Sequence, residues 1–234
     1  MVLSGCETAV RVGINANDRG GGRVSAVVTL DRDAQKVAGG DLTSQLRVVD
    51  LAKAGWKVEG PSKVGKDIRV TATKKFASPA GVARAVRELD NASGLFHGFR
   101  VTQHRSFVRT TTRVRGTVDL RKGIESFSDD ELTDVLGSPL GATPAEFAAR
   151  IGHDLSAALP VTVGVILPGE VESNATSESG GSVAWHPELG ERIAIEATAK
   201  KWNTLPIGFA AVAVLAAGTA VFVGLGGRRR SRRS

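Results

Sequence analysis

The sequence is poor in the residues and motifs that carry familiar chemistry. Its single cysteine, Cys6, excludes an intramolecular disulfide. It has no G-x-S-x-G nucleophile elbow, no P-loop and no H-E-x-x-H zinc motif, and the four histidines lack the spacing of metal ligands. We therefore expect a non-enzymatic protein with no catalytic residues, no metal site and no cofactor.

Three local features invite a catalytic or binding interpretation, but simpler ones account for them. His97 and His104 could approach each other across neighbouring strands, but we favour the simpler interpretation that the histidines are solvated or cap helices. The glycines 20–22 lack the Lys and Ser/Thr of a phosphate-binding loop, so they predict a hairpin turn. Asp129 and Asp130 lie in the first turn of a predicted helix, where negative charge is favourable. A hydrolase whose site is built from distant residues stays open as an alternative.

Charge is concentrated at one end of the chain. The formal net charge is +7, but residues 228–234 hold five arginines. Without these five, the 31 basic residues fall to 26, against 24 acidic ones. The remaining chain is nearly balanced, and its 41% hydrophobic and 24% charged residues are typical of a folded domain.

A long uncharged run precedes the arginine-rich tail. The run from Leu205 to Gly227 would extend roughly 34 Å as a helix, slightly more than the hydrocarbon core of a bilayer. We therefore predict a transmembrane helix over residues 204–227, with the basic tail 228–234 on the cytoplasmic side. Residues 7–203 would then form an extracytoplasmic domain at the cell membrane.

An exported domain needs an N-terminal signal, and the first residues offer a remnant of one. Residues 3–6, Leu-Ser-Gly-Cys, resemble a bacterial lipobox, in which the cysteine is lipidated. The basic and apolar regions of a signal peptide are missing upstream, so we expect that the start is truncated or placed too late. We interpret residues 1–6 as the remnant of a lipoprotein signal and Cys6 as the lipidation site; the alternative is an incidental thiol.

Within residues 7–203 the sequence alternates between strand and helix patterns. Val10, Val12 and Ile14 alternate with other residues before a glycine turn and a second alternating run to Leu30, which predicts a β-hairpin. Gly55 is placed to end a short helix. The other predicted elements are helices over 41–54, 79–89, 129–136 and 144–153, strands over 56–61, 68–72, 99–102, 106–115, 117–120, 161–167, 183–185 and 192–198, and a polar loop over 172–182.

This order predicts an α+β fold. Consecutive strands joined by short turns favour an antiparallel sheet, and several short helices would cover one of its faces. Residues 128–155 would form a helical insert. The predicted fold class is therefore an antiparallel β-sheet domain with several short helices packed on it, plus one C-terminal transmembrane helix.

Several short patterns together carry a family resemblance. They are Cys6 directly before a strand, Gly55-Trp56 after a helix, Leu167-Pro168-Gly169 after a strand, Trp185 before Leu189-Gly190, and the terminal uncharged run with its arginine tail. In this layout the chain resembles the LppM-type membrane lipoproteins of actinobacteria. The resemblance implies an exported α+β domain, a lipobox, a C-terminal transmembrane helix and a suspected role in binding lipids or glycolipids of the cell envelope. Of residue roles it implies only lipidation of Cys6.

Basic residues are concentrated in the predicted strands around residues 99–120. At a spacing of two, Arg109, Arg113 and Arg115 fall on one face of a strand, and Arg100 lies in the preceding strand. Such a face can contact anionic lipid headgroups, while nucleic acid is excluded because the domain is exported. The alternative is an ordinary solvated face of an antiparallel sheet.

A protein partner is the second functional possibility. Ala220 and Gly224 form a small-xxx-small pair that could pack against another membrane-spanning helix. The protein would then be an adaptor that scaffolds a membrane complex.

Overall fold

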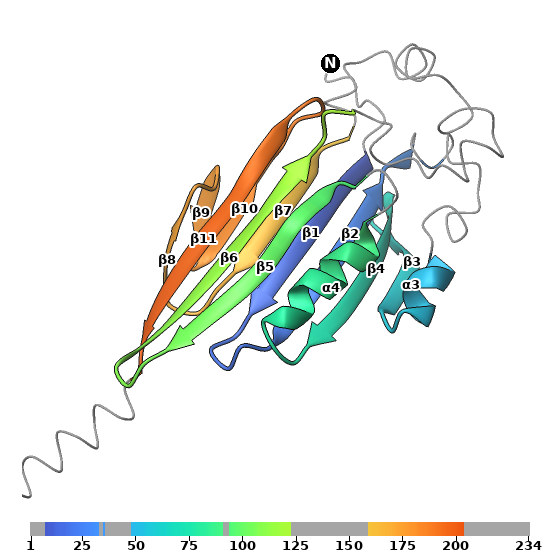
Figure 1. The fold of residues 1–234 in the computed structure, drawn as a ribbon. Coiled ribbons are helices and arrows are strands. Elements are labelled where there is room, and N and C mark those ends of the chain that lie inside the picture. Colours follow the sequence, from blue (N-terminus) through green and yellow to red (C-terminus); the bar gives the residue numbers. More distant parts are fainter. Residues whose placement is uncertain (1–7, 33–34, 36–47, 91–93, 123–158, 204–234) are drawn as a thin grey trace, which may run out of the picture.

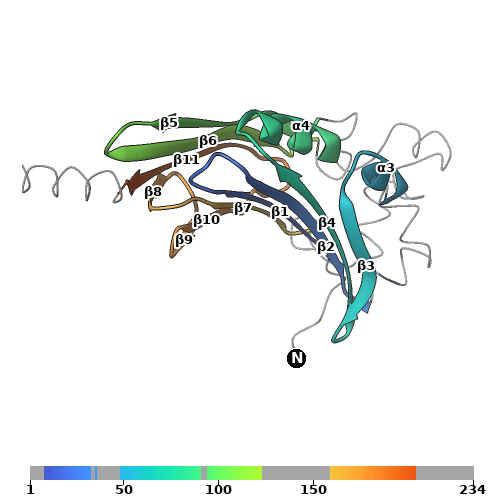
Figure 2. The ribbon, with the colours of Figure 1, turned by 90° about the horizontal axis from the view of Figure 1, so that it is seen from below.

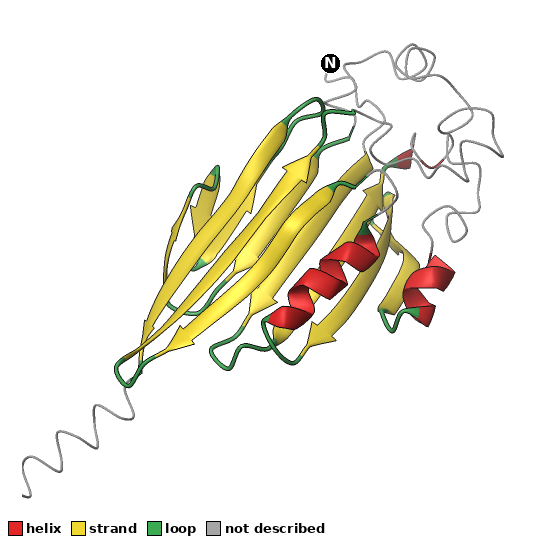
Figure 3. Cartoon of the chain, viewed as in Figure 1, coloured by secondary structure: helices red, strands yellow, loops and turns green. Residues whose placement is uncertain are grey.

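The computed structural model describes residues 8–32, 35, 48–90, 94–122 and 159–203. This part of the chain contains eleven strands and two helices (Figures 1 and 3). The strands are β1 (Thr8–Ala16), β2 (Gly22–Leu30), β3 (Lys57–Val64), β4 (Asp67–Phe76), β5 (Phe96–Arg105), β6 (Arg109–Asp119), β7 (Val161–Ile166), β8 (Glu170–Ser173), β9 (Ser177–Ser179), β10 (Ser182–Trp185) and β11 (Arg192–Trp202), and the helices are α3 (Val48–Lys53) and α4 (Ala80–Leu89).

The strands form two sheets that pack against each other (Figure 2). The larger sheet has seven strands in the order β3-β4-β2-β1-β7-β10-β9, and the smaller has four in the order β5-β6-β11-β8. All pairs are antiparallel except β1 with β7, which run parallel with Val12 opposite Val163. This one parallel pair joins the N-terminal strands of the seven-stranded sheet to its C-terminal strands.

The predicted first hairpin is confirmed. β1 and β2 pair in register from Thr8 opposite Leu30 to Ala16 opposite Gly22. Asn17 shapes the turn, because its side-chain oxygen accepts hydrogen bonds from the backbone N–H groups of Arg19 and Gly21. An asparagine that bonds its own following backbone favours a turn over a continued strand.

Alternating apolar residues on both sheets supply the core. Burying a branched or aromatic side chain contributes about 1.5–3 kcal/mol, so two such faces stabilise each other. The buried residues of the seven-stranded sheet include Val12, Ile14, Val24, Val163, Val165, Val183 and Trp185, and those of the four-stranded sheet include Phe99, Val101, Val114, Val118 and Ile195.

The two helices lie at the side of this sandwich. α4 packs beside β5 and against β2 and β4, and it buries Val82, Ala85 and Val86 (Figures 1 and 2). Gly55 terminates α3 as predicted, because it follows the last turn of the helix with a φ of 86°, in the left-handed region. The N–H groups of Gly55 and Trp56 donate to the carbonyls of Ala52 and Leu51, which is the Schellman pattern.

The predicted start of α4 is displaced by one residue. The predicted helix over 79–89 has Pro79 as its first residue, but Pro79 occupies the N-cap position, α4 begins at Ala80, and Pro79 makes no side-chain cap hydrogen bond. Ser78 contributes its backbone carbonyl instead, which accepts from the N–H of Gly81 at 2.9 Å.

The predicted α+β fold class is wrong for the described part of the chain, which is mainly two packed β-sheets with two short helices. The physical reason is that each sheet presents an apolar face to the other, so a helix is needed only beside β5. The alternation of apolar residues is the same whether a helix or a second sheet covers the face. The predicted polar loop over 172–182 also contains strands, since β9 lies within it and β8 extends into it.

Several other predictions fall outside the described residues. These are Cys6 and the signal remnant 1–6, the helices over 129–136 and 144–153, the transmembrane helix over 204–227 and the tail 228–234. Among the described residues, no helix is both long and apolar enough to cross a bilayer. The transmembrane helix of the predicted fold class therefore has no support in the structure.

Candidate functional site

The predicted basic residues share one solvent-exposed face of the four-stranded sheet. On β6, Arg113 and Arg115 are exposed while Val114 between them is fully buried. On β5, Arg100 is exposed while its neighbour Val101 is buried. We call Arg100, Arg109, Arg113 and Arg115 the basic face; β5 and β6 place them on the side that faces away from the other sheet.

The strand register brings two of these cations together. Arg100 lies directly opposite Arg115, and Arg113 lies opposite Thr102. Side chains directly opposite each other on an antiparallel pair have Cβ atoms about 4.5–5.5 Å apart, so two like charges in these positions repel. A bound anion between them would relieve this repulsion.

The basic face is only partly neutralised by its neighbours. Arg115 lies 3.6 Å from Glu196 on β11, and Arg113 donates a hydrogen bond to the hydroxyl of Thr198 at 3.3 Å. Within the described ranges, Arg100, Arg109 and Arg113 have no acidic partner. Among the described residues, a carboxylate therefore offsets only one of the four cations.

Acidic residues lie at the opposite edge of the same sheet, on β8. Glu172 on β8 accepts a hydrogen bond from Lys200 at 2.5 Å, and this bond and the charge of Lys200 lower the pKa of Glu172. Glu170 is exposed on the same strand. The outer surface of the sheet is thus divided, with cations on β5 and β6 and carboxylates on β8.

A separate ion cluster lies at the C-terminal end of β6, far from the β5–β6 turn. Arg121 donates three side-chain hydrogen bonds to Asp119, at 2.7, 2.9 and 3.2 Å, and Arg192 lies 3.7 Å from the same carboxylate. The hydrogen bonds from Arg121 hold the pKa of Asp119 well below its usual range. Both arginines interact with this one carboxylate, so we interpret the cluster as a structural link at the end of the sheet.

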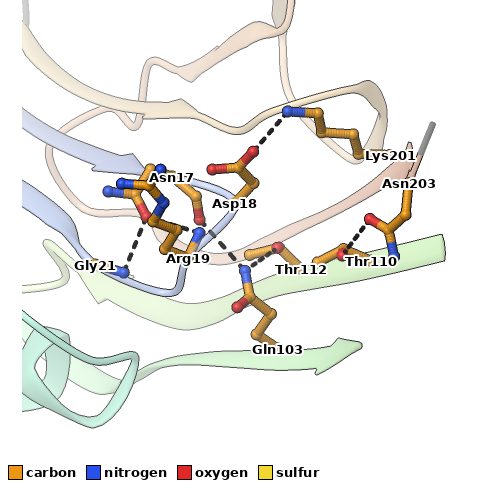
Figure 4. A network of polar contacts seen from close by, with 9 residues as sticks. All are labelled: Asn17, Asp18, Arg19, Gly21, Gln103, Thr110, Thr112, Lys201 and Asn203. Carbon is orange, nitrogen blue, oxygen red and sulfur yellow. Dashed lines mark hydrogen bonds and ion pairs between the residues drawn. The ribbon is translucent and has the colours of Figure 1, made fainter. Parts of the chain in front are cut away.

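Polar contacts link the two sheets near the β1–β2 turn (Figure 4). Asp18 of that turn accepts a hydrogen bond from Lys201 of β11 at 2.7 Å, which lowers the pKa of Asp18. Gln103 of β5 donates to the backbone oxygen of Asn17 at 3.3 Å and to the hydroxyl of Thr112 at 3.1 Å. The interior between the sheets therefore changes from apolar to polar toward this end.

The β5–β6 turn carries exposed apolar residues that the sequence interpretation had placed differently. Phe107 was expected inside a strand, but it lies in the turn between β5 and β6 and is 64% exposed. Trp202 at the end of β11 is 63% exposed and lies opposite Arg109 in the sheet register. The signal that could have identified this feature is a Phe-Val pair, residues 107–108, at a position where a hairpin turn is normally polar.

The predicted approach of His97 and His104 across neighbouring strands is wrong. His97 and His104 lie on the same strand, β5, and not on neighbouring strands as suggested by the sequence. Among the residues that the structure describes, no group of three or more His, Cys, Asp or Glu side chains could hold a metal ion.

Comparison with known proteins gives a family. The family model described as the LppM domain matches residues 7–201. The NMR structure of the folded domain of the LppM protein of Mycobacterium tuberculosis is similar to this chain with 15% sequence identity and a TM-score of 0.43, covering 87% of this chain and 95% of that one. No curated protein sequence matches.

Proposed function

This chain belongs to the LppM domain family, as its sequence resemblance predicted, and from this premise we propose that it is a non-enzymatic envelope protein that binds an anionic lipid or glycolipid. Family membership fits a membrane-associated protein of the lipoprotein type. In our proposal the headgroup binds to the basic face, Arg100, Arg109, Arg113 and Arg115. The lipid anchor would be attached to Cys6.

The position of Arg100 opposite Arg115 is the observation that carries this proposal. Two like charges held next to each other on an exposed strand pair cost stability unless an anion binds between them. Glu196 offsets only part of this cost, since it lies 3.6 Å from Arg115 and both side chains are exposed. A phosphate or carboxylate group of a headgroup would bind to this pair through charge-assisted hydrogen bonds.

The proposal is tested by removing three of the cations. Each basic residue near an anionic surface contributes about 1 kcal/mol, so the full chain with R100S, R113S and R115S should bind phosphatidylglycerol vesicles roughly 100-fold more weakly in a flotation assay. The matched control is K63S, K66S and R69S, which removes the same charge from exposed residues of the β3–β4 hairpin. If neither variant lost vesicle binding, or if both lost it to the same extent, a specific role of the basic face would be contradicted.

Lipidation at Cys6 is tested separately. The chain produced behind a lipoprotein signal peptide in a bacterial host should carry a diacylglyceryl group on its N-terminal peptide, detected by mass spectrometry. The C6S variant should lack it. An unmodified Cys6 in the wild type would contradict this part of the proposal.

An adaptor that scaffolds an envelope complex is the second candidate function. It is favoured by the edge of β3, which in the described part of the chain ends the seven-stranded sheet and exposes Val64 at 42%; Val49 on the neighbouring helix α3 is 57% exposed. Free strand edges and exposed apolar residues are typical of protein-binding surfaces. Cross-linking from a photoreactive group at residue 64 would separate the two candidates, because a defined protein partner supports the adaptor and its absence contradicts it.

A further inference from the structure

The tip of the four-stranded sheet exposes large apolar side chains that other positions of the chain bury. Phe107, Val108 and Trp202 are 64%, 44% and 63% exposed. By contrast, Trp56 and Trp185 are 4% and 2% exposed, and each donates its indole N–H to a side-chain oxygen. We call Phe107, Val108 and Trp202 the apolar tip.

Hydrogen bonds hold the apolar tip in one arrangement. Asn203 donates its backbone N–H to Val108 and its side-chain N–H to the carbonyl of Ser106, both at 2.8 Å. Its side-chain oxygen accepts from the hydroxyl of Thr110 at 3.0 Å (Figure 4). The end of β11 is therefore fastened to the β5–β6 turn, which fixes Trp202 at the same end of the sheet as Phe107 and Val108.

Cations surround the apolar tip. Arg105 and Arg109 flank the turn, and both are exposed. In the described part of the chain neither has an acidic partner. Tryptophan and phenylalanine with flanking arginines are the combination that inserts into the boundary between headgroups and acyl chains of an anionic membrane.

We propose that the apolar tip inserts into the interfacial layer of an anionic bilayer, with Arg105 and Arg109 at the level of the phosphates. A bilayer fits this surface better than a protein does, because the apolar side chains lie at the narrow end of the sheet, two in the β5–β6 turn and one at the end of β11, and two exposed cations, Arg105 and Arg109, flank that turn. This goes beyond the proposed headgroup site, since Phe107, Val108 and Trp202 are not part of the basic face.

Tryptophan fluorescence can test the proposal in the full chain, reconstituted with vesicles of phosphatidylcholine and phosphatidylglycerol in equal parts. Phosphatidylcholine brominated on its acyl chains should quench the fluorescence of Trp202. Aqueous iodide should quench Trp202 less when vesicles are present than in buffer that contains neither vesicles nor detergent. The buried Trp56 and Trp185 should respond to neither quencher, and the W202F variant measures their background. In F107S/V108S the quenching by brominated lipid should be lost, while V64S, which changes an exposed valine elsewhere, should retain it.

Other results would overturn the proposal. One is full iodide access to Trp202 in the presence of vesicles, and another is unchanged lipid quenching in F107S/V108S with a native far-UV circular dichroism spectrum. A blue shift that depends on protein concentration without vesicles would show that a second copy covers the tip. The two proposals fail separately. Vesicle binding that is unchanged by R100S, R113S and R115S contradicts the headgroup site on the basic face, whereas lipid quenching of Trp202 that is unchanged by F107S/V108S contradicts insertion of the apolar tip.

Discussion

The missing side chain of Gly116 lets the ring of Phe99 lie flat over β6. A Cβ atom on Gly116 would lie only 2.6 Å from that ring. Phe99 is 5% exposed and packs edge-to-face on Phe96, with ring centres 5.8 Å apart. Such a pair adds about 0.5–1.5 kcal/mol beyond the area it buries, so the glycine supports the core at one end of the four-stranded sheet.

We therefore expect the substitution Gly116→Ala to destabilise the protein. The new methyl group must displace a buried aromatic ring, and overpacking of this kind costs about 1–3 kcal/mol. Urea unfolding followed by circular dichroism measures the change. The control is Gly164→Ala on β7, where the nearest atom to a new Cβ is the oxygen of Val12 at 4.0 Å. Equal stability of the two variants would show that the ring of Phe99 moves without cost.

At the scale of strands and helices, local patterns in the sequence were sufficient for the hairpins. The β1–β2 hairpin follows from the alternation of Val12 and Ile14 around a turn that starts at Asn17, and all the interactions that define it lie within 23 residues. The end of α3 at Gly55 could be predicted for the same reason. Both features depend on residues that are close together in the sequence, so the sequence alone is enough to predict them.

Pairings between distant residues could not be predicted in this way. The parallel pair of β1 and β7 joins Val12 to Val163, and nothing in the apolar pattern of either strand specifies the other. The same limit applies to the candidate site. The spacing of Arg113 and Arg115 predicted their shared face, but the pairing of Arg100 with Arg115 depends on a register shift between His97 and Arg100 that no local pattern indicates.

The join between β11 and the β5–β6 turn should depend on the side chain of Asn203. In Asn203→Ala the hydroxyl of Thr110, which is 2% exposed, loses its acceptor, and the carbonyl of Ser106 loses a donor. An unsatisfied buried polar group costs about 1–3 kcal/mol. Hydrogen exchange should accelerate at the amides of β6 near the turn and stay unchanged in the β1–β2 hairpin. Uniform acceleration in both hairpins would mean that the whole fold, and not this join, has weakened.

At the scale of the whole molecule, ion pairs join elements that are distant in sequence. The pair of Asp18 with Lys201 connects the first turn to the last strand, and so links the two sheets at the end where their interior becomes polar. Both side chains are more than a third exposed, at 45% and 43%. Solvent and salt screen such pairs, so we expect a contribution of at most about 1 kcal/mol at low ionic strength.

This contribution should depend on pH with a definite sign. The hydrogen bond and charge of Lys201 lower the pKa of Asp18 from an ordinary value of 3.8, so the unfolded chain binds a proton at a higher pH than the folded one. The stabilisation is therefore fully present above pH 3.8 and is lost as the pH falls through the lowered value in the folded state. Comparison of wild type with Asp18→Asn by urea unfolding should show a difference near neutral pH that disappears in strong acid and shrinks in high salt. If the difference persisted in acid, where the protonated aspartic acid and the asparagine are both neutral, the charge of the carboxylate would not be its cause.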